Sequence, residues 1–172
     1  MKKIFLMLAF VGITALQGCE GPEGPQGPEG APGFSAESEV FEVSNVDFTA
    51  TNDWFVTFGL TPTILESDNL LVYELVNTND GIDAWALLPQ IYYFDGGQAQ
   101  YNFNFSYDQF SIFIDTNLDF NTLPATFTQN KVFRIVVVPG YFSKGTPQFD
   151  YTDYDAVIKA FNIDESKIKK LN

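Results

Sequence analysis

The sequence predicts a mainly β protein, a β-sandwich of about seven to eight antiparallel strands with a short C-terminal helical cap. Three observations lead to this fold class. Apolar residues alternate with polar ones at period two in many segments after Phe34, and glycine-containing turn dipeptides separate several of these segments. The period then changes after residue 151 to one typical of a helix. The composition, 45% hydrophobic and 18% charged, supports a packed core.

The candidate strands follow one another with short gaps. In chain order they cover residues 40–48, 54–60, 70–76, 84–88, 91–94, 101–105, 110–114 and 132–138. Asp80-Gly81 and Asp95-Gly96-Gly97 are typical of hairpin turns between such runs. The last run is almost continuously apolar, so we expect residues 132–138 to lie in the centre of a sheet.

The C-terminal segment predicts two short helices. Thr152 and Asp155 have the spacing of a capping box ahead of residues 156–161, and Asn162 is a residue that can end a helix. A second helix is expected from Asp164, with basic residues near its end that suit the helix dipole. These basic residues are Lys167, Lys169 and Lys170.

The N-terminus has the pattern of an export signal. Lys2 and Lys3 precede a largely apolar run, residues 4–16, which is shorter than the roughly 20 residues that span a bilayer. Cys19 then follows Leu16-Gln17-Gly18, which has the form of a bacterial lipobox except that Gln17 is larger than the usual residue. Because Cys19 is the only cysteine, lipidation gives its thiol a use. An ordinary secreted protein is the alternative.

Residues 21–33, GPEGPQGPEGAPG, carry glycine at every third position. This is the collagen period, although the run is very short for a triple helix. A stiff polyproline-II spacer of roughly 40 Å is therefore favoured over a trimerising stem, and a monomer over a trimer. The expected organisation is a signal peptide at 1–18, the lipidated cysteine and collagen-like tether at 19–33, the sandwich at 34–151 and the helices at 152–172.

The charge distribution excludes several functions. The chain has 22 acidic and 9 basic residues and no histidine, and residues 4–130 contain no Lys or Arg. Nucleic acid is therefore not an expected partner, and adsorption to an anionic membrane is disfavoured, so the lipid must provide membrane affinity. Catalysis by Ser-His or Cys-His pairs and His-ligated metals are excluded, and no cofactor is expected. We predict that the protein is not an enzyme.

Six segments carry a family resemblance that covers nearly the whole chain: 19–22 with the Gly-X-Y run, 40–43, 85–90, 130–139, 153–157 and 161–163. Together they resemble the small collagen-like lipoproteins of Bacteroidota, of the type found in Flavobacteria. It implies an outer-membrane lipoprotein and no particular activity. Glu20 and Glu23 are similar in character to the acidic residues that follow the cysteine in surface-exported lipoproteins of that phylum. Display on the extracellular face is therefore favoured over the periplasmic face.

Two kinds of binding site are considered. Asp115, Asn117 and Asp119 form the D-x-N-x-D start of a calcium loop. The motif is incomplete, because Phe120 stands in place of its glycine and Thr126 in place of its final glutamate. A polar turn is the alternative. Aromatic residues could instead stack on sugar rings, and the candidates are Trp54, Trp85 and Tyr101. Tyr101 lies in a segment that also contains Asn102 and Asn104.

The expected function is that of a non-enzymatic outer-membrane lipoprotein, acting as an interaction or structural accessory subunit of an outer-membrane protein complex. A surface glycan-binding module is one alternative. A trimeric adhesin-like protein, nucleated by the Gly-X-Y stem, is the other.

Overall fold

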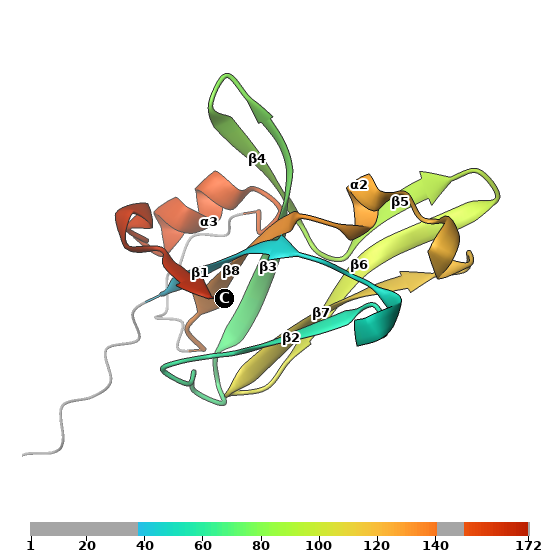
Figure 1. The fold of residues 1–172 in the computed structure, drawn as a ribbon. Helices are drawn as coiled ribbons and strands as arrows, with labels where there is room; N and C mark the ends of the chain where they lie inside the picture. The colour runs from blue at the N-terminus through green and yellow to red at the C-terminus, as the bar shows by residue number, and fades with distance from the viewer. Residues whose placement is uncertain (1–37, 141–149, 172) are drawn as a thin grey trace, which may run out of the picture. The chain divides into compact units, whose positions relative to one another are not determined.

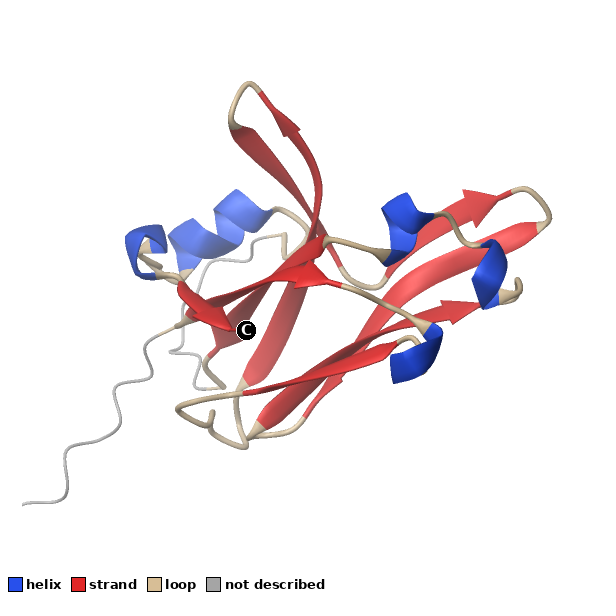
Figure 2. Cartoon of the chain, in the orientation of Figure 1, coloured by secondary structure: helices blue, strands red, loops and turns tan. Residues whose placement is uncertain are grey.

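A computed structural model describes residues 38–140 and 150–171, which form two β-sheets with short helices (Figures 1 and 2). The signal peptide, Cys19 and the Gly-X-Y run lie outside the described residues. The five-stranded sheet has the order β4 (Ile82–Leu87), β3 (Asn69–Asn79), β8 (Lys131–Val138), β1 (Val40–Val46), β9 (Lys169–Leu171). The four-stranded sheet has the order β2 (Phe55–Gly59), β7 (Gln109–Thr116), β6 (Gly97–Phe105), β5 (Gln90–Phe94).

The main core lies between the two sheets. Phe41, Val72 and Ile135 from the five-stranded sheet and Tyr101 and Ile112 from the four-stranded sheet belong to one buried cluster and are fully buried. The mainly β prediction is therefore confirmed, and two sheets that share one apolar core are consistent with a β-sandwich. β8 lies between β3 and β1, so the prediction of a central position for its nearly continuous apolar run is also confirmed.

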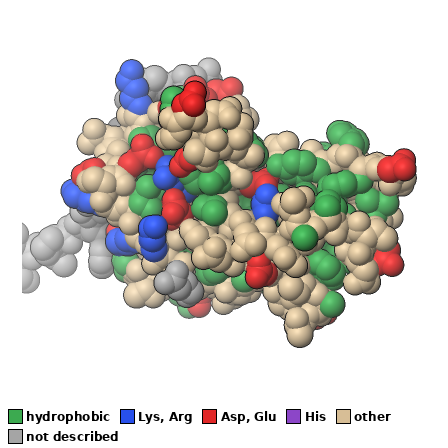
Figure 3. All heavy atoms as spheres, turned by 45° about the horizontal axis from the view of Figure 1, so that its top comes forward, with side chains coloured by type: hydrophobic (Ala, Val, Ile, Leu, Met, Phe, Trp, Pro, Cys, Tyr) green, Lys and Arg blue, Asp and Glu red, His purple; other side chains and the backbone are tan. Residues whose placement is uncertain are grey.

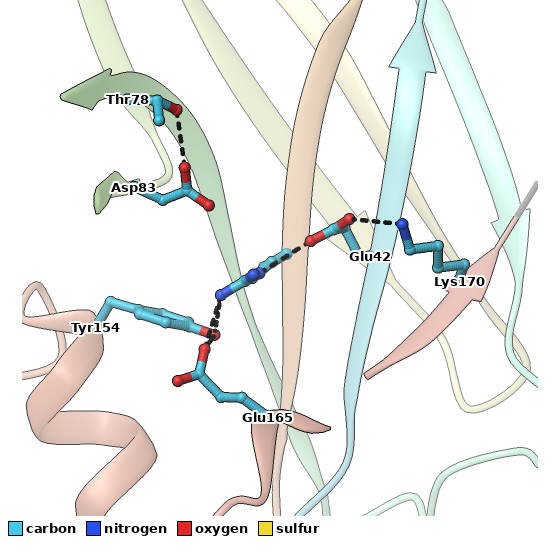
Figure 4. A network of polar contacts seen from close by, with 7 residues as sticks. Glu42, Thr78, Asp83, Tyr154, Glu165 and Lys170 are labelled. Atoms are coloured by element: carbon cyan, nitrogen blue, oxygen red, sulfur yellow. Dashed lines mark hydrogen bonds and ion pairs between the residues drawn. The ribbon is translucent and has the colours of Figure 1, made fainter. Parts of the chain in front are cut away.

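The two hairpin turns form where glycine allows them. Asp80 and Gly81 both adopt positive φ, at 51° and 80°, as the favoured two-residue turn between antiparallel strands requires. Thr78 donates a 2.8 Å hydrogen bond from its hydroxyl to Asp83 across this β3–β4 hairpin, which projects away from the rest of its sheet (Figures 1 and 4). Gly96 has a φ of 83° in the turn between β5 and β6.

The helix α3 (Tyr154–Ala160) covers the outer face of the five-stranded sheet. Tyr154 and Val157 of this helix form a second buried cluster with Tyr73, Val136 and Val138 of the sheet. The alternation along β8 explains why two clusters exist, since successive residues of a strand point to opposite faces. The expected helical cap is therefore present as a third layer on this side.

The residue that caps α3 differs from the prediction. The Asp153 carboxylate accepts a 3.1 Å hydrogen bond from the backbone N–H of Ala156, so Asp153 is the N-cap. Thr152, which the capping-box spacing favoured, instead donates both its N–H and its hydroxyl to Asp150. Asn162 takes a φ of 51° directly after the helix, in agreement with its predicted role as a helix-ending residue.

The second predicted helix is only one 3-10 turn, η3 (Glu165–Lys167), and the chain then enters β9. β9 pairs in parallel with β1, so the expectation of an entirely antiparallel sandwich was wrong for this pair. The free edge of β1 offers backbone partners to the last residues of the chain, and Lys169 forms a 2.6 Å ion pair with Glu39 beside it. These contacts are non-local, which is why local sequence pattern did not predict this strand.

Three further one-turn helices connect the strands. They are η1 (Ala50–Asn52), η2 (Phe120–Thr122) and α2 (Ala125–Thr128). α2 contributes Phe127 to the main core, where its ring stacks on that of Tyr101 with 4.5 Å between the ring centroids.

Candidate functional site

Tyr101, one of the predicted sugar-stacking residues, lies in the main core. Its ring is fully buried and its hydroxyl donates a hydrogen bond to the backbone carbonyl of Phe127. Burial raises the pKa of its hydroxyl, and the nearby charge of Glu74 adds to this effect. The prediction that Tyr101 could present its ring to a ligand is therefore wrong, because no part of the ring reaches solvent.

The two tryptophans also pack against the protein itself. Trp54 contacts the main core and stacks on Phe120, with 5.1 Å between ring centroids. Trp85 is half-buried on the outer face of the five-stranded sheet, where the guanidinium of Arg134 lies 4.2 Å from the ring centroid. Tyr154 packs beside the same ring at 5.6 Å. Each indole thus has an intramolecular aromatic neighbour.

Arg134 is the centre of a polar network that attaches the C-terminal elements to the sheet. Its side chain donates to Glu42 at 3.1 Å, to the Tyr154 hydroxyl at 2.9 Å and to Glu165 at 2.8 Å. Figure 4 shows the three acceptors converging from β1, α3 and η3, with Lys170 3.8 Å from the other Glu42 oxygen. Because Arg134 is paired with two carboxylates, this cluster stabilises the fold and offers no unpaired cation to an anionic ligand.

A groove of about 520 Å³ opens beside the same elements, where the start of β1 meets the segment that follows α3. Its charged lining residues are mutually paired. Lys169 contacts Glu39 at 2.6 Å, and Lys167 contacts Asp164 at 3.4 Å. The groove therefore has no excess charge of either sign from these four side chains.

The three predicted calcium ligands, Asp115, Asn117 and Asp119, each accept a hydrogen bond from a different residue. Asn117 accepts a 2.8 Å hydrogen bond from the backbone N–H of Gln98, and Asp119 caps η2 by accepting from Asn121 at 3.0 Å. Asp115 accepts a 3.3 Å hydrogen bond from the Gln100 side chain. Among residues 38–140 and 150–171, no group of three or more His, Cys, Asp or Glu side chains is arranged to hold a metal.

The outer face of the four-stranded sheet is a further candidate surface, and the register of its strands defines which residues belong to it. The residues of this sheet that alternate with the core positions all lie on its outer face, which we call the open face. It consists of Phe55 and Thr57 on β2, Ser111, Phe113 and Asp115 on β7, Gln98, Gln100, Asn102 and Asn104 on β6, and Ile91 and Tyr93 on β5. α3 covers the outer face of the other sheet, whereas the open face has several exposed members.

The side chains of the open face are amides, hydroxyls and aromatic rings. Asn102 and Asn104 make no side-chain hydrogen bond to any residue of the described part of the chain. The ring of Phe55 is 39% exposed and stacks on Phe113 across the strands, with 5.4 Å between centroids. Tyr93 is 80% exposed at the other side of the face. The face can therefore offer free donors and acceptors next to apolar contact area.

The open face carries no Lys or Arg, and its one acid, Asp115, is hydrogen-bonded to Gln100. The Lys and Arg side chains of the described residues lie on β8, α3, η3 and β9. Figure 3 shows these side chains mainly toward the side of the domain that carries the C-terminal elements, and none at the end farthest from them. The open face thus has no basic side chain and one acidic side chain, Asp115.

The sequence contained one signal for this surface. Gln98, Gln100, Asn102 and Asn104 occur at period two, so all four amides must share one face of a strand. Alternation in this segment shows that one set of residues is buried, but not which set faces solvent, so Tyr101 was the predicted ligand contact. The register with β7 and the burial of Tyr101 make that assignment.

In the part of the chain that the structure describes, no helix is both long and apolar enough to cross a membrane. Comparisons of the chain with protein-family models, with curated proteins and with solved structures found no match.

Proposed function

We propose that the protein is a non-enzymatic lipoprotein of the outer membrane, anchored through Cys19 and displayed on the extracellular face. In this proposal it acts as an interaction or structural accessory subunit, and its recognition surface is the open face. The Gly-X-Y run at residues 21–33 is proposed as the spacer that separates this surface from the membrane.

The difference between the outer faces of the two sheets is the observation that carries the binding role. The five-stranded sheet is covered by α3, whose Tyr154 and Val157 are buried against it. The four-stranded sheet instead exposes aromatic side chains, and the amides of Asn102 and Asn104 have no hydrogen-bonding partner among the described residues. Exposed aromatic residues beside polar groups are typical of recognition surfaces.

The use of two carboxylates of the five-stranded sheet supports a non-enzymatic role. Glu74 is 1% exposed and forms an ion pair with Lys131 at 2.8 Å, while Glu42 pairs with Arg134. Both carboxylates are therefore paired with cations of their own sheet, which is a structural use.

The binding role is tested by photo-cross-linking in intact cells. A photoreactive amino acid replaces Ile91, an exposed residue on β5 at the border of the open face, in the full-length protein, and a matched variant carries it at Asn79, at the tip of the β3–β4 hairpin. We expect a slower-migrating adduct only from position 91. If neither position gives an adduct, or both give the same adducts, the open face is not the recognition surface and the proposal fails.

A further inference from the structure

We propose that the ligand of the open face is a neutral glycan, bound across β6 by its row of amides and flanked by aromatic side chains. This inference rests on the proposed recognition role of the open face and names the chemical class of its ligand.

The first support is the geometry of the amides. Gln98, Gln100, Asn102 and Asn104 project from the same face of β6, with successive side chains about 7 Å apart along the strand. Each amide has both an acceptor oxygen and a donor nitrogen. A sugar hydroxyl also donates and accepts, so a row of amides can pair with successive hydroxyls of an extended chain of sugar residues.

The second support is the placement of apolar area beside this row. Phe113 on β7 lies directly across from Asn102 in the register and stacks with Phe55, while Tyr93 on β5 lies across from Gln98. Sugar rings carry C–H groups on their faces, and such groups pack favourably against aromatic side chains. The aromatic residues thus border the amide row on both neighbouring strands.

The third support is the charge of the surface. The face lacks Lys and Arg, so an anionic polymer or an anionic lipid surface would find no counter-charge there. Its one carboxylate, Asp115, accepts a hydrogen bond from the neutral amide of Gln100. A neutral polar ligand therefore suits this surface better than an anionic one.

The same residues disfavour a second copy of the chain as the occupant. Interfaces between copies of one chain are more apolar at their centre than the rest of the surface. The centre of the open face is instead formed by Asn102, Asn104, Gln100 and Ser111, and burial of unpaired amides is costly.

The test uses the full-length lipidated protein in a detergent without a sugar headgroup. The labelled protein is applied to an array of neutral gluco-, manno-, galacto- and xylo-oligosaccharides, with sulfated and uronic-acid oligosaccharides as charged counterparts. We expect binding to neutral members that persists up to about 0.5 M salt, because no ion pairs are involved. The dissociation constant for the best-bound member is then measured for the variants.

Asn102→Ala/Asn104→Ala is expected to weaken this binding about tenfold or more through the loss of several hydrogen bonds. Tyr93→Ala is expected to weaken it through the loss of apolar contact, while Asn79→Ala, at the hairpin tip, is expected to bind as the wild type does. Urea unfolding of each variant ensures that a loss of binding is not a loss of folding.

Four results would overturn the inference. They are no binding to any neutral oligosaccharide, a preference for the acidic ones, equal binding by the double variant, and a dimer in solution that the double variant dissociates. The cross-linking experiment separates this failure from failure of the proposed function. Mass spectrometry of the digested adduct makes this distinction. Peptides of a second protein attached at position 91 would retain the recognition role and refute the glycan, whereas an attached sugar mass that periodate removes supports both.

Discussion

Tyr92, on the four-stranded sheet, donates its hydroxyl at 2.7 Å to the carboxylate of Glu74, which is buried on the five-stranded sheet. Lys131 completes the arrangement with a 2.8 Å ion pair to the other oxygen of Glu74, and its ammonium lies 5.6 Å from the Tyr101 ring centroid. The two sheets are thus joined by a polar contact as well as by their shared apolar core.

This arrangement predicts a large cost for removing the cation. Lys131→Met leaves the Glu74 carboxylate buried without its counter-charge, so the free energy of unfolding should fall by about 3 kcal/mol. Urea denaturation measures the change. Lys159→Met is the control, since Lys159 is exposed and makes no ion pair with a described residue, and it should change stability by less than about 0.5 kcal/mol. Equal effects would show that the Glu74 pair has no special role.

The buried tyrosines predict a loss of stability at alkaline pH. Burial raises the pKa of the Tyr73, Tyr92, Tyr101 and Tyr154 hydroxyls above the ordinary value of about 10. Below that value both the folded and unfolded chains are protonated, and the stability is fully present. As the pH rises further, the unfolded chain releases protons that the folded chain keeps, so the free energy of unfolding falls.

Urea denaturation at about pH 9 and about pH 11 measures this fall. Tyr92→Phe removes one of the ionisable groups, so the fall in this variant should be smaller than in the wild type. Stability that is unchanged across this range, or a fall that is larger in Tyr92→Phe, would contradict the explanation.

The backbone around Gly140 leaves no room for a side chain at this position. Its N–H donates to Asp68 at 3.1 Å, and an added Cβ would collide with the backbone carbonyl of Ser67, which cannot rotate away. Gly140→Ala should therefore destabilise the fold by about 1–3 kcal/mol. Gly59→Ala is the matched control, because a Cβ there meets nothing within 4 Å, and alanine is favoured over glycine in a strand by about 0.5 kcal/mol. Thermal unfolding of both variants should show shifts of opposite sign.

The anchoring part of the proposal depends on Cys19. A Cys19→Ala variant has no thiol to receive lipid, so it should move from the outer-membrane fraction to the soluble fraction. It should also lose incorporation of labelled fatty acid. A variant that still sediments with the outer membrane would show that the attachment does not depend on this cysteine.

The elements that could be predicted from the sequence are those determined by residues close together in the chain. The β3–β4 hairpin follows from Asp80-Gly81, and the central position of β8 follows from its apolar run. β9 was missed because three residues carry no period, and only the edge of β1 makes them a strand. The alternation around Tyr101 predicted a two-faced strand, but the buried set became known only from the pairing of β6 with β7 and from the core beneath it.

The position of β1 has a mechanical consequence. This strand begins at Val40 and is held by β8 on one side and β9 on the other. Tension applied along β1 at Val40 would run parallel to the strand, while its hydrogen bonds to β8 run perpendicular to it and those to β9 run at a slant. The hydrogen bonds of β1 to β8 and to β9 would then be loaded in shear and would have to break together. The hydrogen bonds of a hairpin pulled apart at its open end break one after another instead. The pairing of β1 on both edges therefore favours resistance to tension along this strand.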